Sequence, residues 1–321
     1  MKVTSVDIFE CNTPNPLLDP LFVRVNTDEG ISGFGEIGLA YGKSKYGGLG
    51  QVKDLAKLMI GWDPMNNEGL WEMYKKNTFW GQGGQCGGMV FQAAVSALDI
   101  AVWDIKGKAL NVPCYQLLGG KTNPTIRAYA SQLQFDWDKV HRNIADPKEY
   151  AEATRKAMAQ GYTAIKVDPL CVKPNGVYAR EPKPDPSWRL RGSLSPEVLN
   201  MGYERVKAMR EAGGDKLDII IELHAFTDMT TSVQLGQRLE ELGIYYLEEP
   251  TDPTNVKTMK EIHNKLNIPI ASGERIATRW GFRDFLEATA LQVIQPDLCV
   301  AGALTEVKKI CAMAYVYDAG V

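Results

Sequence analysis

The sequence lacks several features that would place it in other classes of protein. The first residues, MKVTSVDIFE, contain no apolar run long enough for a signal peptide or anchor. The most apolar helical stretch, Ala93–Trp103, carries Asp99 and is too short to span a bilayer. Its 36 basic and 39 acidic side chains give a net charge of −3, with no basic excess for nucleic acid. The six cysteines form no CxxC pair, which favours free thiols in a reducing compartment. We therefore expect a cytoplasmic protein that binds neither nucleic acid nor a membrane.

Nucleotide-binding motifs are also missing. The glycine-rich segment Gly81–Gly88 has neither the lysine nor the hydroxyl residue of a phosphate-binding loop, so we interpret it as a connection between helices. No GxGxxG motif follows the first predicted strand, which argues against a dinucleotide-binding fold. A hydrophobic content of 45% nevertheless predicts a large buried core.

The first part of the chain predicts a small antiparallel sheet followed by helices. β-rich segments at Val3–Ile8, Leu21–Val25 and Ser32–Ile37 precede a helical pattern over Leu49–Leu110. Gly33 and Gly35 lie within the third segment, where they indicate a bulge or a close approach of another backbone.

After Gly120, short β-rich runs alternate with amphipathic helical stretches. This alternation predicts a parallel sheet, and six such units in about 200 residues favour a closed βα barrel. The predicted strands are Ile126–Ala130, Ala164–Val167, Ile219–Leu223, Tyr245–Leu247, Ile268–Ala271 and Leu291–Ile294.

One segment interrupts this alternation. Leu170–Pro196 is rich in proline and charge and follows the second predicted barrel strand. Active sites of βα barrels lie at the carboxyl ends of the strands. The segment is therefore either a lid or substrate-specificity loop, or a surface insertion without such a role.

Three glutamates stand at equivalent ends of consecutive predicted strands. Glu248 follows Glu222 by 26 residues, and Glu274 follows Glu248 by 26 residues. One βα unit separates each pair, so the three carboxylates are expected to converge at the mouth of the barrel. Their mutual repulsion would be relieved by a hard divalent cation, and oxygen-only ligands favour Mg²⁺, with Mn²⁺ as a substitute.

Two further pairs of residues follow the same i, i+2 relation in a strand. His224 lies two residues after Glu222, so its imidazole is expected beside the metal, available for acid–base chemistry. Lys166 and Asp168 follow one another in the same way on the second barrel strand. Lys166 is either a substrate-binding or catalytic residue or the ion-pair partner of a ligand carboxylate.

The remaining candidates are Asp297 and two histidines. Asp297 ends the sixth predicted strand, where it could orient a histidine in an acid–base dyad or simply cap the next helix. His141 and His263 lie in helical or loop context and are interpreted as surface residues without a role.

The chain resembles the mandelate racemase subgroup of the enolase superfamily. The resemblance covers nearly the whole sequence: Val23–Gly38 resembles the hairpin of the subgroup's capping domain, and Ala94–Gly120 resembles its helix and entry to the barrel. The glutamates 222, 248 and 274 match the three metal ligands. The Lys-x-Lys motif that is common on the second barrel strand of the subgroup is absent here, since the sequence at that place is Lys166-Val167-Asp168.

The resemblance implies an α/β protein with a modified (β/α)7β TIM-like barrel and an α+β capping domain. The domain limits expected from it are 1–121 for the cap and 122–321 for the barrel. The base histidine of the subgroup's His–Asp dyad would lie just beyond Val321, so the C-terminal part of the barrel and cap is expected to be missing. The resemblance also implies a homo-oligomer, from a dimer to an octamer.

The same resemblance implies a function. The position of His224, two residues after the first metal ligand, resembles that of a histidine in the sugar-acid dehydratases, such as galactonate dehydratase. These enzymes act on aldonates or aldarates. In such a reaction the proton α to a carboxylate leaves to give an ene-diolate, and loss of water yields a 2-keto-3-deoxy acid. Catalytic roles would fall to His224 and Asp297. Substrate binding by Lys166 and Asp168 is suggested by their place at the second strand end, rather than by the resemblance.

Two alternatives stay open. The first is an epimerase, racemase or cycloisomerase on similar carboxylates, which would need bases on both faces of the substrate. The second is a non-catalytic, metal-binding protein with a sensing or regulatory role. Specificity for one sugar acid would lie in the loops around Pro14–Pro20, Tyr41–Gly50 and Leu170–Pro196.

Overall fold

The computed structural model describes residues 1–13, 18–39, 44–84, 86–138, 141–179 and 188–321. By their internal contacts the residues form two compact units. The first comprises Met1–Pro124 with Gly273–Glu287 and Ile294–Val321, and the second comprises Thr125–Ser272 with Ala288–Val293.

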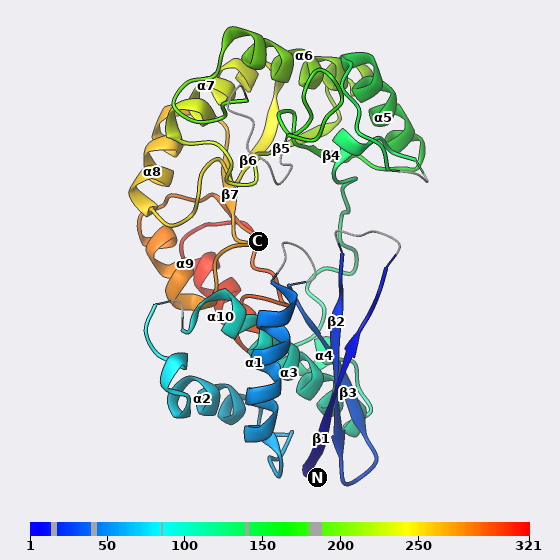
Figure 1. The fold of residues 1–321 in the computed structure, drawn as a ribbon, viewed down its shortest axis with the longest axis vertical. Coiled ribbons are helices and arrows are strands. Elements are labelled where there is room, and N and C mark those ends of the chain that lie inside the picture. The colour runs from blue at the N-terminus through cyan, green and yellow to red at the C-terminus, as the bar shows by residue number, and fades with distance from the viewer. Residues whose placement is uncertain (14–17, 40–43, 85, 139–140, 180–187) are drawn as a thin grey trace. The chain divides into compact units, whose positions relative to one another are not determined.

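The first unit contains a three-stranded antiparallel sheet in the order β1-β2-β3 (Figure 1). The predicted sheet and the helices after it are confirmed, with slightly longer strands. The elements are β1 (Val3–Glu10), β2 (Leu21–Thr27), β3 (Ser32–Ile37), α1 (Lys45–Met59), α2 (Asn67–Asn77), a 3-10 turn at Phe79–Gly81, α3 (Gly88–Ala109), α4 (Cys114–Leu117), α9 (Thr278–Glu287) and α10 (Ala303–Val316).

The sheet packs closely against helix α3. A side chain at Gly33 would collide with the carbonyl oxygen of Ala101, and one at Gly35 with the carbonyl oxygen of Ala97. The two glycines therefore mark a close backbone approach, as one of the two sequence interpretations had it. Val23 and Val25 of β2 point into the same core and are fully buried.

Helix α3 is the core helix of this unit. It has 22 residues, twice the apolar stretch recognised in the sequence, and it is the one helix in the described part of the chain that is long and apolar enough to cross a membrane. The greater part of it is buried inside the protein, as in the core of a globular domain. Asp99, in its middle, accepts a hydrogen bond from the Thr305 hydroxyl of α10 at 2.7 Å.

The second unit is built on parallel strands. The sheet has the order β4-β5-β6-β7-β8, and helices α5 to α8 follow one another along its outer side in Figure 1. The elements are a 3-10 turn at Leu133–Phe135, α5 (Pro147–Ala159), β4 (Ala164–Val167), α6 (Pro196–Gly213), β5 (Asp218–Glu222), α7 (Met229–Leu239), a 3-10 turn at Glu240–Leu242, β6 (Ile244–Glu248), α8 (Val256–Lys265), β7 (Ile270–Ser272) and β8 (Val293–Ile294).

Local sequence signals set the starts of these helices. Asp146 and Asp228 form capping boxes at α5 and α7, where each aspartate accepts a backbone N–H and the residue three positions on returns a bond. Ser195 caps α6 just before Pro196, and proline is well tolerated in the first helical turn. These caps determine the residue at which the loop before α5, α6 or α7 ends and the helix begins.

The first predicted barrel strand is wrong as a regular strand. Ala130 alone forms a parallel bridge, to Ile165, and Ile126 is 92% exposed. Ala130 exchanges backbone hydrogen bonds with the Ala164 carbonyl and the Lys166 amide, so the segment joins the sheet at its last residue only. Apolar composition suggested a strand here, but residues 125–129 are exposed, so burial does not stabilise an extended backbone.

Candidate functional site

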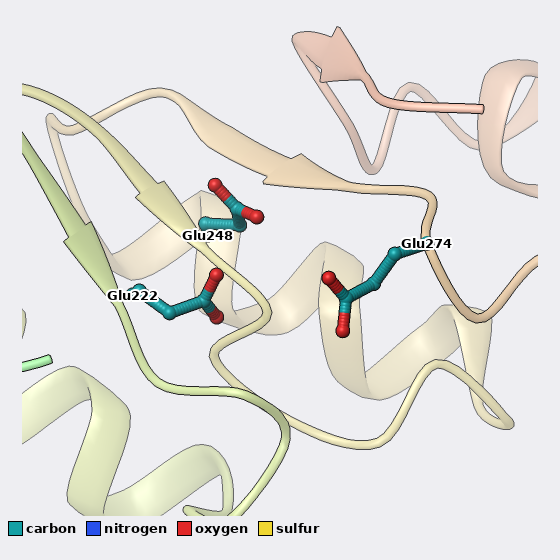
Figure 2. Close-up of side chains that lie close together, drawn as sticks. All are labelled: Glu222, Glu248 and Glu274. Carbon is teal, nitrogen blue, oxygen red and sulfur yellow. The ribbon is translucent and has the colours of Figure 1, made fainter. Parts of the chain in front are cut away.

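Strand register brings the three predicted carboxylates together. Glu222 and Glu248 are the last residues of β5 and β6 and stand opposite one another in the parallel register. Glu274 follows the last residue of β7 by two positions. One carboxylate oxygen from each of the three lies within 4.8 Å of those of the others, and Figure 2 shows the carboxylates gathered at the strand ends.

This donor set fits a hard divalent cation. Two oxygens bound to one ion are separated by at most twice the metal–oxygen distance, about 4–5 Å for Mg²⁺ or Ca²⁺. Separations within 4.8 Å meet that limit for a Ca²⁺-sized ion, and Mg²⁺ would need the carboxylates slightly closer together. All three offer oxygen, the donor that such ions prefer. Glu222 and Glu248 are 2% and 3% exposed, whereas Glu274 is exposed and pairs with Arg275.

Lys166 reaches the two buried glutamates from β4. Its Nζ atom lies 3.1 Å from Oε2 of Glu222 and 2.8 Å from Oε1 of Glu248, and its side chain is 13% exposed. Burial alone would lower the pKa of the Lys166 ammonium, but the charges of Glu248 and Glu222 outweigh it and raise the pKa above its usual value. Of the two sequence interpretations, the structure therefore shows the ion pair.

His224 and Asp168 form a second pair of side chains beside this cluster. The Nδ1 atom of His224 lies 3.0 Å from Oδ2 of Asp168 and 3.7 Å from Oε1 of Glu222. The backbone N–H of His224 donates to Oε1 of Glu222 at 2.7 Å, and His224 has a φ of 47°. His224 therefore follows Glu222 in a left-handed turn that folds back on the glutamate, where the sequence had predicted a continued strand.

Buried polar residues hold Asp168 in place. Asp168 is 2% exposed; its Oδ1 accepts the backbone N–H of Leu170, and its own N–H donates to Oε1 of Gln134. Arg205 of α6, fully buried, donates to the carbonyl oxygens of Pro169 and Val172 just after it.

Gln134 and Arg205 were not among the site residues predicted from the sequence. For Arg205 a signal was available, because it lies on the apolar side of α6 with Val198, Gly202 and Met209, where a charged residue is out of place. Gln134 carries no such signal, since it lies in the short 3-10 turn at Leu133–Phe135, which has no periodic pattern.

The remaining candidates, Asp297, His141 and His263, do not take part in these contacts. Asp297 is exposed, and its Oδ1 accepts the backbone N–H of Cys299 at 2.7 Å, so it caps a turn; its role in a dyad stays a prediction. His141 is exposed and stacks on Phe135, as expected. His263 is half-buried on α8, where burial lowers the pKa of its imidazole, so it lies only partly at the surface.

The loops assigned to specificity are only partly described. Residues 14–17, 40–43 and 180–187 lie outside the described residues, and Lys45–Gly50 belongs to helix α1 rather than to a loop. Leu170–Val172, at the start of the insertion, is buried. At its end, Arg191 donates to the carbonyl oxygens of Ala225 and Phe226, immediately after His224.

Comparison with known proteins identifies the family. Residues 19–119 match the family "Mandelate racemase / muconate lactonizing enzyme, N-terminal domain", and residues 149–321 match "Enolase C-terminal domain-like". The second match runs to residue 321 and so does not support the expectation that the C-terminal part of the barrel and cap is missing. The capping domain and the α/β barrel domain predicted from the sequence are both confirmed at this level.

Individual relatives agree with this result. The chain is 30% identical to a D-galactonate dehydratase of Verminephrobacter eiseniae, over 94% of the chain and 70% of that protein. It is 29% identical to a D-gluconate dehydratase of Thermoproteus tenax, over 93% of the chain and 54% of that protein. A solved structure of an enolase superfamily member from Salmonella Typhimurium superposes with a TM-score of 0.94 at 51% identity, covering 99% of the chain and 79% of that protein. The chain belongs to the mandelate racemase/muconate lactonizing enzyme family of the enolase superfamily.

Proposed function

We propose that this protein is a Mg²⁺-dependent hydro-lyase that removes water from an aldonate or aldarate and produces a 2-keto-3-deoxy acid. The observation that carries the proposal is the position of His224, folded against Glu222 beside the cluster of three carboxylates. Relatives that are named for the dehydration of galactonate and gluconate, both aldonates, support this class of substrate.

The residues divide the chemistry between them. Glu222, Glu248 and Glu274 would hold the cation, which, when bound, stabilises negative charge on the substrate carboxylate as the α-proton leaves. The α-proton would pass to the base of the acid–base dyad that Asp297 is expected to orient. His224, in its protonated form, would donate a proton to the hydroxyl on the β-carbon, so that the carbon–oxygen bond breaks and water departs. The resulting enol takes up a proton at the β-carbon to give the keto acid, and the net change is the loss of one water.

Lys166 has a supporting role in this scheme. Its ammonium neutralises part of the charge on Glu222 and Glu248, which limits the repulsion between these buried carboxylates. It also places a positive charge beside the carboxylates, where an anionic substrate would enter.

A racemase or epimerase is less well supported. Those reactions need a base on each face of the substrate, and at the end of β4 the residue is Asp168, bonded to His224, rather than a second lysine. The carboxylate of Asp168 is also buried, so it is poorly placed to take a proton from a substrate carbon.

The test is a panel of aldonates and aldarates incubated with the protein and Mg²⁺, with formation of 2-keto-3-deoxy acid measured by its carbonyl reaction. We expect turnover of at least one member, its loss in EDTA and its recovery when Mg²⁺ or Mn²⁺ is added. His224→Asn should lower the rate about 10²–10⁴-fold, because it removes the proton donor. The matched control is His141→Asn, an exposed histidine, which should retain full activity.

Two results would contradict the proposal. The first is exchange of the substrate α-proton with solvent and inversion of configuration, without loss of water, which would identify an epimerase. The second is metal binding with no turnover of any substrate in the panel, which would favour a sensing or regulatory protein.

A further inference from the structure

The carboxylate of Asp168 lies within hydrogen-bond distance of the His224 imidazole, whereas the sequence pattern had suggested a substrate-binding role. We propose that Asp168 is a positioning residue, which fixes the ring orientation and the tautomer of His224. This inference rests on the proposed function, because it explains how His224 would present one particular ring nitrogen to the substrate.

Strand geometry places the two residues side by side. Val167 of β4 stands opposite Ile221 of β5 in the parallel register, so the chain segments that follow leave the sheet next to one another. Asp168 comes directly after Val167, and His224 comes three residues after Ile221. The left-handed turn at His224 and Ala225, with φ of 47° and 59°, brings the imidazole back toward Asp168.

The hydrogen bond determines which nitrogen carries the proton. An ionised carboxylate accepts hydrogen bonds only, so with Asp168 ionised the Nδ1 atom of His224, 3.0 Å from Oδ2 of Asp168, is the donor. In a neutral imidazole the proton is then on Nδ1, and Nε2 is the basic nitrogen. When the ring is protonated, Nδ1 keeps its bond to Asp168 and the second proton is on Nε2, so Nε2 is the atom from which His224 would donate a proton to the substrate.

Asp168 also keeps the imidazole away from a metal ligand. Nδ1 of His224 lies 3.7 Å from Oε1 of Glu222, beyond hydrogen-bond distance, but a small rotation of the ring would close that gap. The carboxylate of Asp168 competes successfully for the same nitrogen. Without it, the imidazole would be expected to turn toward Glu222, and the proton would no longer be confined to Nδ1.

The support for Asp168 does not depend on His224. The backbone N–H groups of Asp168 and Leu170 bond to Gln134 and to the Asp168 carboxylate itself, respectively, both within buried surroundings. Arg205 holds the next turn through the carbonyl oxygens of Pro169 and Val172, at 2.8 and 2.7 Å. A carboxylate fixed in this way can orient a neighbouring ring, because it does not move to follow it.

The test uses the small number of histidines. With only three in the chain, selective ¹⁵N labelling of histidine gives three ring spectra, and His224→Asn identifies the one from His224. Spectra are recorded on the Mg²⁺-loaded protein, well above the ordinary imidazole pKa of about 6.5. We expect the Nδ1–H tautomer at His224 in the wild type and a mixture, or the Nε2–H tautomer, in Asp168→Asn, because an amide can donate to Nδ1 as well as accept.

Kinetics provide the second measurement. Asp168→Asn should lower kcat about 10²–10⁴-fold and change KM less than about threefold, since a positioning residue acts on His224 and not on substrate binding. Asp168→Glu, which keeps the carboxylate, should recover part of kcat and most of the Nδ1–H signal. Asp146→Asn is the matched control, because Asp146 caps α5 and asparagine caps equally well.

The outcomes separate this inference from the proposed function. An unchanged Nδ1–H tautomer in Asp168→Asn, or a loss expressed in KM alone, would overturn the positioning role. If the wild type dehydrates no sugar acid, the proposed function fails, but the ring spectra still decide whether Asp168 fixes His224. If Asp168→Asn does not fold, Asp168→Glu decides in its place: a shifted tautomer with unchanged kcat would refute the inference.

Discussion

The Nζ atom of Lys166 lies 2.8 Å from Oε1 of Glu248, and a metal ion bound by the proposed ligands would share that glutamate with the lysine. Without an ion, the Lys166 ammonium supplies positive charge to Glu222 and Glu248, and it lies within hydrogen-bond distance of both. The stability of the metal-free protein should therefore depend on Lys166.

Lys166→Met tests this dependence. Removing one partner of a buried ion pair leaves uncompensated charge, so the metal-free variant should lose about 3 kcal/mol of unfolding free energy. Mg²⁺ should raise Tm more in the variant than in the wild type, because the ion then replaces the missing charge. Lys257→Met, at an exposed position of α8, is the control. Equal Tm shifts on adding Mg²⁺ in all three proteins would mean that Lys166 does not compensate the ligand charges.

Asp99 should make stability depend on pH. Burial raises its pKa to about 7, and the hydrogen bond from Thr305 opposes this only in part. The unfolded chain releases this proton near pH 4 and the folded chain near pH 7, so stability falls as pH rises through that interval, by on the order of 4 kcal/mol.

Unfolding by urea between pH 4 and pH 8 isolates this effect. The difference in unfolding free energy between the wild type and Asp99→Asn should change across the interval and be constant above it, because asparagine does not titrate. Asp54→Asn, at an exposed position of α1, should track the wild type at every pH. Parallel curves for the wild type and Asp99→Asn would show that Asp99 does not titrate in this range.

Glycine at position 35 should be required for folding of the first unit. Gly35→Ala places a methyl group against the carbonyl oxygen of Ala97 in α3 and should cost about 3 kcal/mol or more. Gly50→Ala is the matched change in open space within α1, and it should raise stability by up to about 1 kcal/mol. Thermal unfolding of the two variants gives the answer, and a stable Gly35→Ala variant would disprove the close packing of β3 on α3.

The strand ends could be predicted from the sequence because their chemistry is periodic. Equal spacing between Glu222, Glu248 and Glu274 reflects one βα unit each, and the parallel register then brings the carboxylates together. Lys166 was correctly placed in the same mouth, but its two possible roles could be separated only by its distances to Glu222 and Glu248.

The surroundings of His224 could not be predicted in the same way. The turn at His224 is left-handed, a backbone conformation that neither a histidine nor the following alanine signals. Its partner Asp168 comes from another strand end, 56 residues earlier, and depends on Gln134 and Arg205 for its position. Such long-range polar contacts have no periodicity, so they become visible only when the fold is known.

The insertion after β4 is fastened at both of its ends, on one side by Arg205 at Val172 and on the other by Thr231, whose hydroxyl donates to the Leu190 carbonyl oxygen. For protein engineering, this arrangement defines a segment with two fixed ends that can be replaced as a unit. The stretch between Val172 and Leu190 can be exchanged for that of a relative while the two fastenings, and with them Asp168 and the turn at His224, are retained. A library of such exchanges would test whether this stretch determines substrate preference, with Asp168 and His224 left in their original places.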